Sequence, residues 1–325
     1  MENSSLIKIN YSEKNFRNST PIYSLNKNRL SINSIDFQNE LLLISSDDST
    51  IEIYEIIKGI NIFSYSDSLN GTFNAQFLKR NDTIIYTTKT DYSIILYDYS
   101  KKKSLFQMFS HLYFINEINY NRINNILITK DDSGFAYIWN ISSFQDEIFL
   151  DSKYGLESIS SCVVDYNGEN IYSVKNLESH KIEIMILNVN FNNDNELYIK
   201  NHNFHLFNSN EKVNKIKVSN DNNCLVLLYD YLIEIIDISN KNDFKKIKNI
   251  IRKEKLLNIE ISPDSQMFII TDEFGKFLGT FFDKLEISIC KRLHYSSCKG
   301  VKFSEKYNLF ATYSDKVVVS RLNFN

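Results

Sequence analysis

The chain has 325 residues, of which 43% are hydrophobic and 14% aromatic, enough to build a large core and too many for a disordered chain. Its formal net charge of −3 at pH 7 argues against a general nucleic-acid binder, whose surface has to be basic. The first residues lack the apolar segment of a secretory signal peptide, and no run of 18 apolar residues occurs. We therefore expect a soluble, intracellular protein.

The cysteines indicate neither a disulfide framework nor a zinc site, because the four residues are scattered and form no Cys-x-x-Cys pair. Cys162, Cys224 and Cys290 lie in or beside apolar strand patterns. The pattern predicts buried free thiols there, in a reducing compartment.

Residues 32–54 (INSIDFQNELLLISSDDSTIEIY) read as three strands joined by two short polar turns. In the third strand Ile51 and Ile53 alternate with polar or amphipathic neighbours, which is the period of a half-buried strand and not of a helix. Asp48 closes the preceding turn six residues before Tyr54. This unit is the reference for the rest of the chain.

The unit recurs six more times, which predicts a repeat architecture. Asp91 stands six residues before Tyr97, and the only tryptophan, Trp139, follows one repeat later. In that third unit Ser133 takes the place of the turn Asp, with Asp132 one step further back, so we expect weaker turn chemistry. The fourth unit is the least regular, and a polar loop is expected at 190–195.

Three or four strands are predicted in each of these units, and the first unit has its fourth strand at 60–65. After the first unit, the predicted strands are 73–77, 83–88, 93–98 and 104–109; 115–120, 126–129, 135–141 and 148–150; 159–165, 171–174 and 181–189; 213–218, 224–228 and 230–237; 257–262, 266–271, 276–282 and 286–289; and 299–303, 309–313 and 316–322.

The seventh unit leaves too few residues after 322 for a fourth strand, so residues 21–25 are expected to supply it from the other end of the chain. Pro21 is acceptable there because the outermost strand of a blade is a sheet edge. Such a strand closes the ring and removes exposed edges. We predict an all-β fold, a single seven-bladed β-propeller over residues 1–325, with 1–15 as a flexible or surface-packed segment.

Catalytic and cofactor signatures are absent from the sequence, which has no phosphate-binding glycine loop, nucleophile elbow or His-Glu-x-x-His motif. His202 and His205 form the only close histidine pair, and we interpret their polar surroundings as a solvated loop and not as a metal site. The repeated aspartates recur at turns, where capping explains them better than paired acid–base chemistry. No catalytic, cofactor-binding or metal-binding residue is predicted.

The repeats resemble WD40 repeats, in which an Asp precedes a Trp or Tyr by six residues. Ser110-His111 stands where WD40 repeats often carry Gly-His, and Ser262-Pro263-Asp264 is similar to their turn between the first two strands. The resemblance implies that His111 bonds the turn Asp of a hairpin and helps to hold its strands together.

A narrower resemblance points to one WD40 subunit, shared by the COMPASS histone methyltransferase complex and the cleavage-and-polyadenylation machinery. It covers about a third of the chain, in blades one, two and six. The motifs that carry it are Ile32-Asn33-Ser34-Ile35-Asp36-Phe37, Ser45-Ser46-Asp47-Asp48-Ser49-Thr50-Ile51, Tyr54, Tyr65-Ser66, Ile84-Ile85-Tyr86, Thr88-Lys89, Asp91, Ile94 and residues 262–270. The sequence departs from that family at Asp67-Ser68, which replace a basic pair, at Tyr92, which replaces a second turn acid, and at Ser110.

This resemblance implies a non-catalytic nuclear scaffold that holds peptide segments of larger subunits, in histone methylation or in mRNA 3′-end processing and phosphatase assemblies. It needs no cofactor, membrane or specific nucleic acid. The expected partner-binding surface lies on the first two blades, although turn and packing roles explain the same residues equally well. These residues are Asp47, Asp48, Tyr65, Ser66, Lys89, Asp91 and Tyr92.

Two other functions are compatible with the repeats. An adaptor of an unrelated complex would share every repeat feature. A phosphoinositide-binding propeller would need a basic site, and its usual Arg-Arg pair is missing. Only the tract 241–255, with seven Lys or Arg residues, could replace that pair, and we interpret it as a solvated outer strand and loop.

Overall fold

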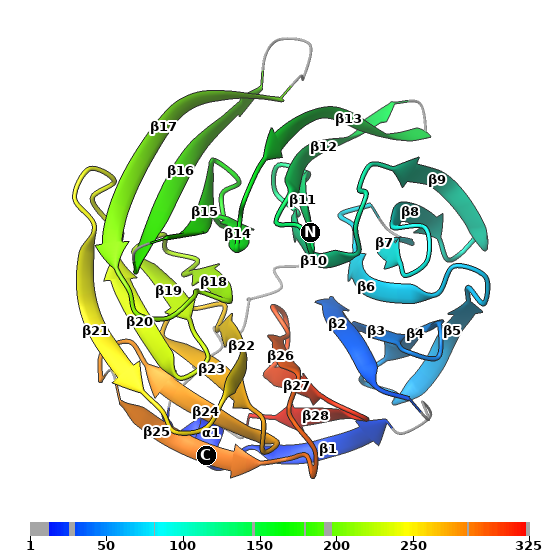
Figure 1. Ribbon diagram of the computed structural model, residues 1–325. Helices are drawn as coiled ribbons and strands as arrows, with labels where there is room; N and C mark the ends of the chain where they lie inside the picture. Colours follow the sequence, from blue (N-terminus) through cyan, green and yellow to red (C-terminus); the bar gives the residue numbers. More distant parts are fainter. Residues whose placement is uncertain are drawn as a thin grey trace, which may run out of the picture.

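The computed structural model describes residues 13–25, 30–80, 82–144, 147–178, 180–191, 197–284 and 286–322. The strands form seven four-stranded antiparallel sheets that stand as blades around a central axis (Figure 1). The chain is therefore a seven-bladed β-propeller, which confirms the predicted fold.

Each blade takes its strands from the centre outwards in chain order, apart from the outermost strand of blade 7. Blades 1 to 4 consist of β2 Ile32–Gln38, β3 Leu41–Ser46, β4 Thr50–Glu55 and β5 Ile60–Ser66; β6 Thr72–Phe77, β7 Thr83–Thr88, β8 Ser93–Asp98 and β9 Lys103–Phe109; β10 Ile115–Asn121, β11 Ile126–Asp131, β12 Ala136–Phe144 and β13 Glu147–Leu156; and β14 Ser161–Val164, β15 Asn170–Leu177, β16 Lys181–Phe191 and β17 Leu197–Asn208. Blades 5 to 7 consist of β18 Lys215–Val218, β19 Cys224–Leu228, β20 Leu232–Asp237 and β21 Lys245–Ile251; β22 Leu256–Ile261, β23 Met267–Asp272, β24 Lys276–Phe281 and β25 Ile287–Arg292; and β26 Gly300–Phe303, β27 Leu309–Tyr313, β28 Val317–Arg321 and β1 Thr20–Leu25.

Burial follows the position of a strand in its blade. All six residues of β8 are buried, whereas β9, the outer strand of the same blade, is mostly exposed or half-buried. Middle strands carry apolar side chains on both faces because a neighbouring blade covers each face. One of the resulting cores packs Ile53 and Phe63 of blade 1 against Phe77 and Tyr97 of blade 2.

The fourth blade differs most from its prediction. Strand β16 continues to Phe191, so that Asn190 lies in a strand and not in the expected polar loop. Residues 192–196 lie outside the described residues. The predicted loop around His202 and His205 is wrong too, because both belong to β17. Polar outer strands of this kind lack the apolar alternation on which the prediction depends.

The cysteine prediction is wrong for one residue. Cys162 is buried and Cys224 is half-buried, but Cys290 is exposed because it lies on β25, the outer strand of blade 6. Cys298 is buried, and all four thiols are free.

The ring closes as predicted, because β1 pairs in antiparallel fashion with β28. Pairs between the two ends of the chain include Thr20 with Arg321 and Leu25 with Val317, and a register shift follows Pro21. An N-terminal strand thus completes the blade that the C-terminal strands begin. Closure gives β28 a hydrogen-bonding partner along its outer edge.

A short helix, α1 (Glu13–Arg17), precedes β1 and packs between blades 6 and 7. Its Phe16 is fully buried, with its ring stacked 5.1 Å from Phe310 and edge-on to Phe303 at 6.0 Å. Arg17 donates a hydrogen bond to the Ser288 carbonyl at 3.0 Å. The segment before the closing strand is therefore anchored in an interblade groove.

Antiparallel order places the connections on two opposite faces. We call the face with the turns between second and third strands and the connections between blades the upper face. The lower face carries the turns between first and second and between third and fourth strands. The turn at Asp48 and the connection at Leu112 lie on the upper face, and the turn at Ile57 lies on the lower face.

Replacing Phe16 with Ala should lower the free energy of unfolding by about 3 kcal/mol, because a fully buried aromatic side chain leaves a cavity between two blades. Phe109→Ala is the matched control, since Phe109 is 68% exposed on β9. Urea denaturation followed by tryptophan fluorescence measures both changes. Equal effects of the two substitutions would contradict the anchoring role of α1.

Candidate functional site

Two of the predicted surface residues meet across the boundary between blades 1 and 2. The Lys89 ammonium lies 2.8 Å from the Asp47 carboxylate. Burial tends to raise the pKa of Asp47, but the hydrogen bond and charge of Lys89 hold this pKa below its ordinary value. The pair joins the upper-face turn of blade 1 to that of blade 2.

Two other predicted residues cap the turns in which they lie. Asp48 accepts a hydrogen bond from the Thr50 amide at 3.0 Å. Asp91 accepts from the Ser93 amide at 3.3 Å and from the Ser93 hydroxyl at 3.0 Å. Their carboxylates thus shape the upper face from within the turns.

The remaining predicted residues divide between packing and surface. Tyr65 is half-buried, with its ring 4.6 Å from Tyr97 in the core between blades 1 and 2. Ser66 is exposed at the end of β5. Tyr92 has a positive φ of 55° and lies edge-on to Phe114 at 6.4 Å.

An aromatic cluster on the upper face was missed by the sequence analysis. Phe114 precedes β10 and lies 4.6 Å, centroid to centroid, from Phe73 of blade 2. Leu112 and Tyr113, in the same connection, are 85% and 55% exposed. We call Phe73, Tyr92, Leu112, Tyr113 and Phe114 the upper apolar patch. Its sequence signal is the apolar run 112–114 in a connection, where polar residues are expected.

A buried hydrogen-bond network supports this patch from below. The His111 ring lies 2.8 Å from the Asp131 carboxylate through Nδ1 and 2.8 Å from the Thr129 hydroxyl through Nε2. Trp139 donates from its indole nitrogen to the same hydroxyl at 2.9 Å. The strands β11 and β12 and the connection that carries Leu112 are therefore fixed together.

The turn acid of blade 3 is Asp131, not Ser133 as the six-residue spacing predicts. Asp131 accepts from the Ser133 amide at 3.0 Å and from the Phe135 amide at 3.1 Å. Burial favours a raised pKa for Asp131, but bonds from Ser133 and His111 hold the pKa below its ordinary value. The acid that caps the turn thus lies two residues before the predicted position, and its hydrogen bonds to the turn are not weakened.

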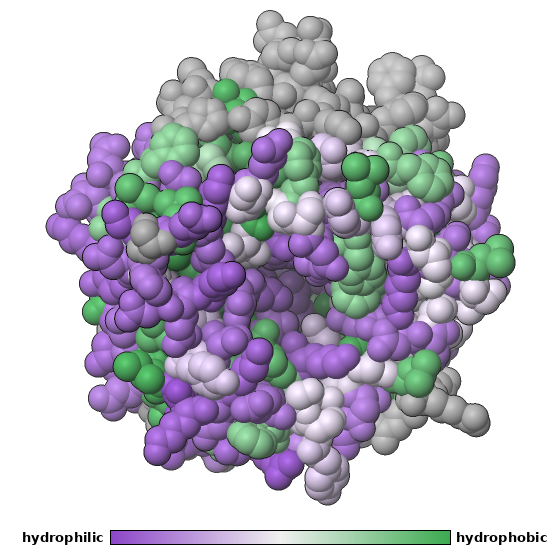
Figure 2. Space-filling view, in the orientation of Figure 1, coloured by the Kyte–Doolittle hydropathy of each residue, from purple (hydrophilic) through white to green (hydrophobic). Residues whose placement is uncertain are grey.

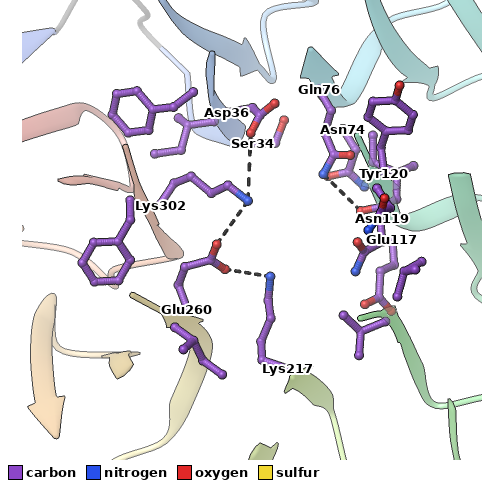
Figure 3. A pocket seen from close by; sticks show the side chains of 18 of the residues that line it. Ser34, Asp36, Asn74, Gln76, Glu117, Asn119, Tyr120, Lys217, Glu260 and Lys302 are labelled. Atoms are coloured by element: carbon purple, nitrogen blue, oxygen red, sulfur yellow. Dashed lines mark hydrogen bonds and ion pairs between the residues drawn. The ribbon is translucent and has the colours of Figure 1, made fainter. Parts of the chain in front are cut away.

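The central channel is a polar cavity of about 320 Å³, lined by the first strands of the blades. Polar residues surround the hollow at the centre of the face seen in Figure 2. In Figure 3, Glu260 lies between Lys217 and Lys302, at 2.7 Å and 3.1 Å, and Lys302 also reaches Asp36 at 4.0 Å. These ion pairs join blades 5, 6, 7 and 1.

Arg122 extends this series of ion pairs across the channel. Its guanidinium, on the lower-face turn of blade 3, lies 2.8 Å from Asp36 of blade 1 and 3.4 Å from Glu305 of blade 7. It also donates to the Phe37 carbonyl at 2.8 Å. The channel charges therefore brace the ring near its lower mouth.

Lys215 is a channel cation for which no carboxylate lies within ion-pair distance among the described residues. Burial, together with the charge of Lys217, lowers the pKa of Lys215 to about 8. Its side chain therefore titrates closer to neutral pH than a surface lysine does.

Within the parts of the chain that the structure describes, no three His, Cys, Asp or Glu side chains are grouped as metal ligands would be. The His205 ring contacts the Lys241 carbonyl at 2.9 Å and stacks on Phe244 at 4.0 Å. It contributes to packing between blades 4 and 5.

The basic tract forms the exposed outer strand β21 and its flanks, as expected for a solvated strand. Several of its charges are paired. Lys246 lies 2.5 Å from Glu234. Further partners are Asp243 for Lys245, Glu254 for Arg252 and Asp230 for Lys255. These carboxylates reduce the positive potential that phosphate binding would require.

No protein-family model matches the chain, and no curated protein matches it significantly. In the described part of the chain, none of the helices has the length and apolarity needed to cross a lipid bilayer.

Replacing Glu260 with Gln tests the bracing role of the channel. The pKa of Glu260 is about 2, against an ordinary value of 4.5, because Lys217 and Lys302 outweigh the opposing effect of burial. Its stabilisation is therefore complete above pH 4.5 and is lost as the pH falls toward 2. At pH 7, Glu260→Gln should cost about 2 kcal/mol, since the half-buried Lys217 loses its carboxylate and the half-buried Lys302 keeps only Asp36 at 4.0 Å.

The matched control is Glu305→Gln, because Glu305 lines the same channel but its side chain is 70% exposed. This change should cost less than about 1 kcal/mol. Urea denaturation from pH 7 to pH 3 measures both variants against the unmodified protein. An acid-dependent loss of stability that is the same with and without Glu260 would contradict the bracing role.

Proposed function

We propose that the chain is a WD40-type propeller, and the network of His111, Asp131, Thr129 and Trp139 carries this proposal. The WD40 resemblance predicts a bond between this histidine and the turn Asp, and the two side chains lie 2.8 Å apart. A shared hydroxyl completes the network and links it to the only tryptophan of the chain. In blades 1 and 2 a turn Asp stands six residues before a Tyr, at Asp48 and Tyr54 and at Asp91 and Tyr97, which supports the same assignment.

The function that the geometry supports best is that of a non-catalytic scaffold which binds peptide segments of larger proteins. The upper apolar patch presents exposed apolar side chains on a rigid support, as interface anchors require. Charged groups flank it, including the Asp47–Lys89 pair. Repeated aspartates could also suggest acid–base chemistry, but Asp48 and Asp91 accept hydrogen bonds within their own turns.

The partners that we propose are subunits of nuclear assemblies for histone methylation, mRNA 3′-end processing, or both. Support comes from the sequence resemblance of blades one, two and six. The proposed contact surface joins the upper apolar patch to the residues that this resemblance indicates. Those residues are Asp47, Asp48, Tyr65, Ser66, Lys89, Asp91 and Tyr92.

Purification of the tagged protein from its native cell, with quantitative mass spectrometry, tests the choice of partner. We expect subunits of a Set-domain methyltransferase complex or of the polyadenylation machinery to be recovered. Recovery of neither group would contradict this choice and leave the adaptor of another assembly as the function.

Replacing Leu112 with Asp should reduce recovery of the principal partner about tenfold or more, because a charge would enter the upper apolar patch. Leu206→Asp is the matched control, since Leu206 is 61% exposed on the outer strand β17. Its partners should be unchanged. Equal recovery with both variants would contradict binding at this patch.

A further inference from the structure

Two further exposed aromatic side chains lie on the upper face, on blades 6 and 7. Tyr295, in the connection between these blades, is 89% exposed, and Phe274, in the turn between β23 and β24, is 50% exposed. The connection and the turn are bonded together, because the Leu293 and His294 amides donate to the Gly275 carbonyl at 3.1 Å and 3.2 Å. The two aromatic side chains therefore belong to one continuous surface.

The connection that carries Tyr295 is held in the same way as the connection in the upper apolar patch. His294 is buried, and its Nε2 lies 2.9 Å from the Thr312 hydroxyl. These two residues are 18 apart in the sequence, as His111 and Thr129 are. In both connections the residue after the buried histidine extends a large side chain into solvent.

Further bonds fix the backbone beneath Tyr295. Arg292 donates from Nε to the His294 carbonyl at 3.1 Å and from its guanidinium to the Tyr295 carbonyl at 3.0 Å. The Ser296 hydroxyl lies 2.7 Å from the Ser314 hydroxyl of blade 7. A ligand that covers this aromatic side chain therefore has little backbone to order, which favours binding.

Positive charge surrounds the two aromatic side chains. In four neighbouring segments of this surface, seven Lys or Arg residues stand against three Asp or Glu residues. We call these segments the basic sector, and they are 252–255, 273–276, 292–299 and 314–316. The Glu273 amide, which donates to the Lys255 carbonyl at 3.0 Å, joins the first segment to the second.

Two of these cations lie next to the aromatic rings. The Lys276 ammonium is 5.9 Å from the centroid of the Phe274 ring. The Lys316 ammonium is 5.7 Å from the centroid of the Tyr295 ring. Apolar and positively charged groups thus alternate over a short distance.

Most cations of the basic sector form no ion pair with a carboxylate among the described residues. Arg252 pairs with Glu254, and Lys255 pairs with Asp230. The cations without such a pair are Lys253, Lys276, Arg292, Lys299 and Lys316. An acidic ligand would therefore bind them without breaking an existing ion pair.

Carboxylates on the neighbouring blades limit the size of an acidic ligand. On the upper face, Asp47 and Asp48 lie on blade 1, next to blade 7, and Glu211 and Asp230 lie on blade 5, next to blade 6 (Figure 1). A polynucleotide or an anionic membrane would extend over these carboxylates and be repelled. A short acidic peptide segment fits within the basic sector.

We propose that the basic sector binds a short acidic segment of another protein that carries one apolar side chain. The apolar side chain packs on Tyr295 and Phe274, and the flanking carboxylates pair with Lys276 and Lys316. The sector shares no residue with the contact surface proposed on blades 1 to 3. Neither site depends on the other.

The test measures binding of a labelled, capped heptapeptide to the full-length protein by fluorescence anisotropy. The peptide has one central phenylalanine with three glutamates on each side. We expect saturable binding at about 50 mM salt that weakens about tenfold at about 300 mM salt, because salt screens exposed charges. Peptides with glutamine in place of glutamate, or alanine in place of phenylalanine, should each bind about tenfold more weakly.

Replacement of an aromatic side chain locates the binding. Tyr295→Ala should weaken binding about tenfold, and it leaves the core intact because the side chain is 89% exposed. Tyr113→Ala is the matched control in the upper apolar patch, where the side chain is 55% exposed. This control and Leu112→Asp should bind the peptide as the unmodified protein does.

Charge reversal tests the electrostatic part of the proposal. The double variant with Lys276→Glu and Lys316→Glu should lose saturable binding, because both ammonium groups beside the rings are replaced. Lys102→Glu with Lys103→Glu is the matched control, since both lysines are exposed on the lower-face turn of blade 2 and the net charge changes equally. The control should keep the affinity of the unmodified protein.

Several results would overturn the proposal. They are the absence of saturable binding at millimolar peptide, equal affinity of the Tyr295→Ala and Tyr113→Ala variants, and equal affinity of the two double variants. Loss of binding in Leu112→Asp would assign the peptide to the upper apolar patch. Tighter binding of an eight-nucleotide oligouridylate than of the peptide would assign the basic sector to single-stranded RNA.

Discussion

The structure depends on the pairing of β1 with β28, through which the two ends of the chain form one blade. A ring of blades is stable only when every blade has a neighbour on both faces, because the apolar cores lie between blades. Blade 7 without β1 would expose its third strand, in which Val317 to Val319 are buried. The closing strand therefore protects the cores on both sides of blade 7, and α1 adds Phe16 to one of them.

Electrostatic interactions support the same closure at the centre of the ring. Glu260, Lys302 and Asp36 connect three consecutive blades, including the pair that meets at the closure. Arg122 reaches Asp36 from across the channel. In a narrow channel such ion pairs are partly shielded from water, so they are stronger than surface pairs. These channel charges are therefore placed to hold the blades together.

Much of the fold could be predicted from the sequence because local signals repeat. Alternation such as Ile51-Glu52-Ile53 indicates a strand, and the recurring turn aspartates indicate the length of the repeat. The prediction failed where a strand has little apolar alternation, as in β17, and where a turn has extra residues, as at Asp131. The closing strand was predictable because the last unit lacks a fourth strand.

The candidate site was less predictable because it joins residues from different blades. Lys89 and Asp47 are both in the predicted surface, and the ring geometry brings them to 2.8 Å. Phe73 and Phe114 form a cluster only because their blades are neighbours. Sequence spacing cannot show which side chains meet across a blade boundary, and only the apolar run at 112–114 gives a local signal.

The most direct test of the central claim, that the upper face of this ring holds a partner segment, is hydrogen–deuterium exchange. Amide exchange would be measured for the isolated protein and for the same protein within the assembly that co-purifies with it. The account predicts slower amide exchange at residues 90–92 and 112–114 in the assembly. Unchanged exchange at both segments, with protection only on outer strands, would contradict it.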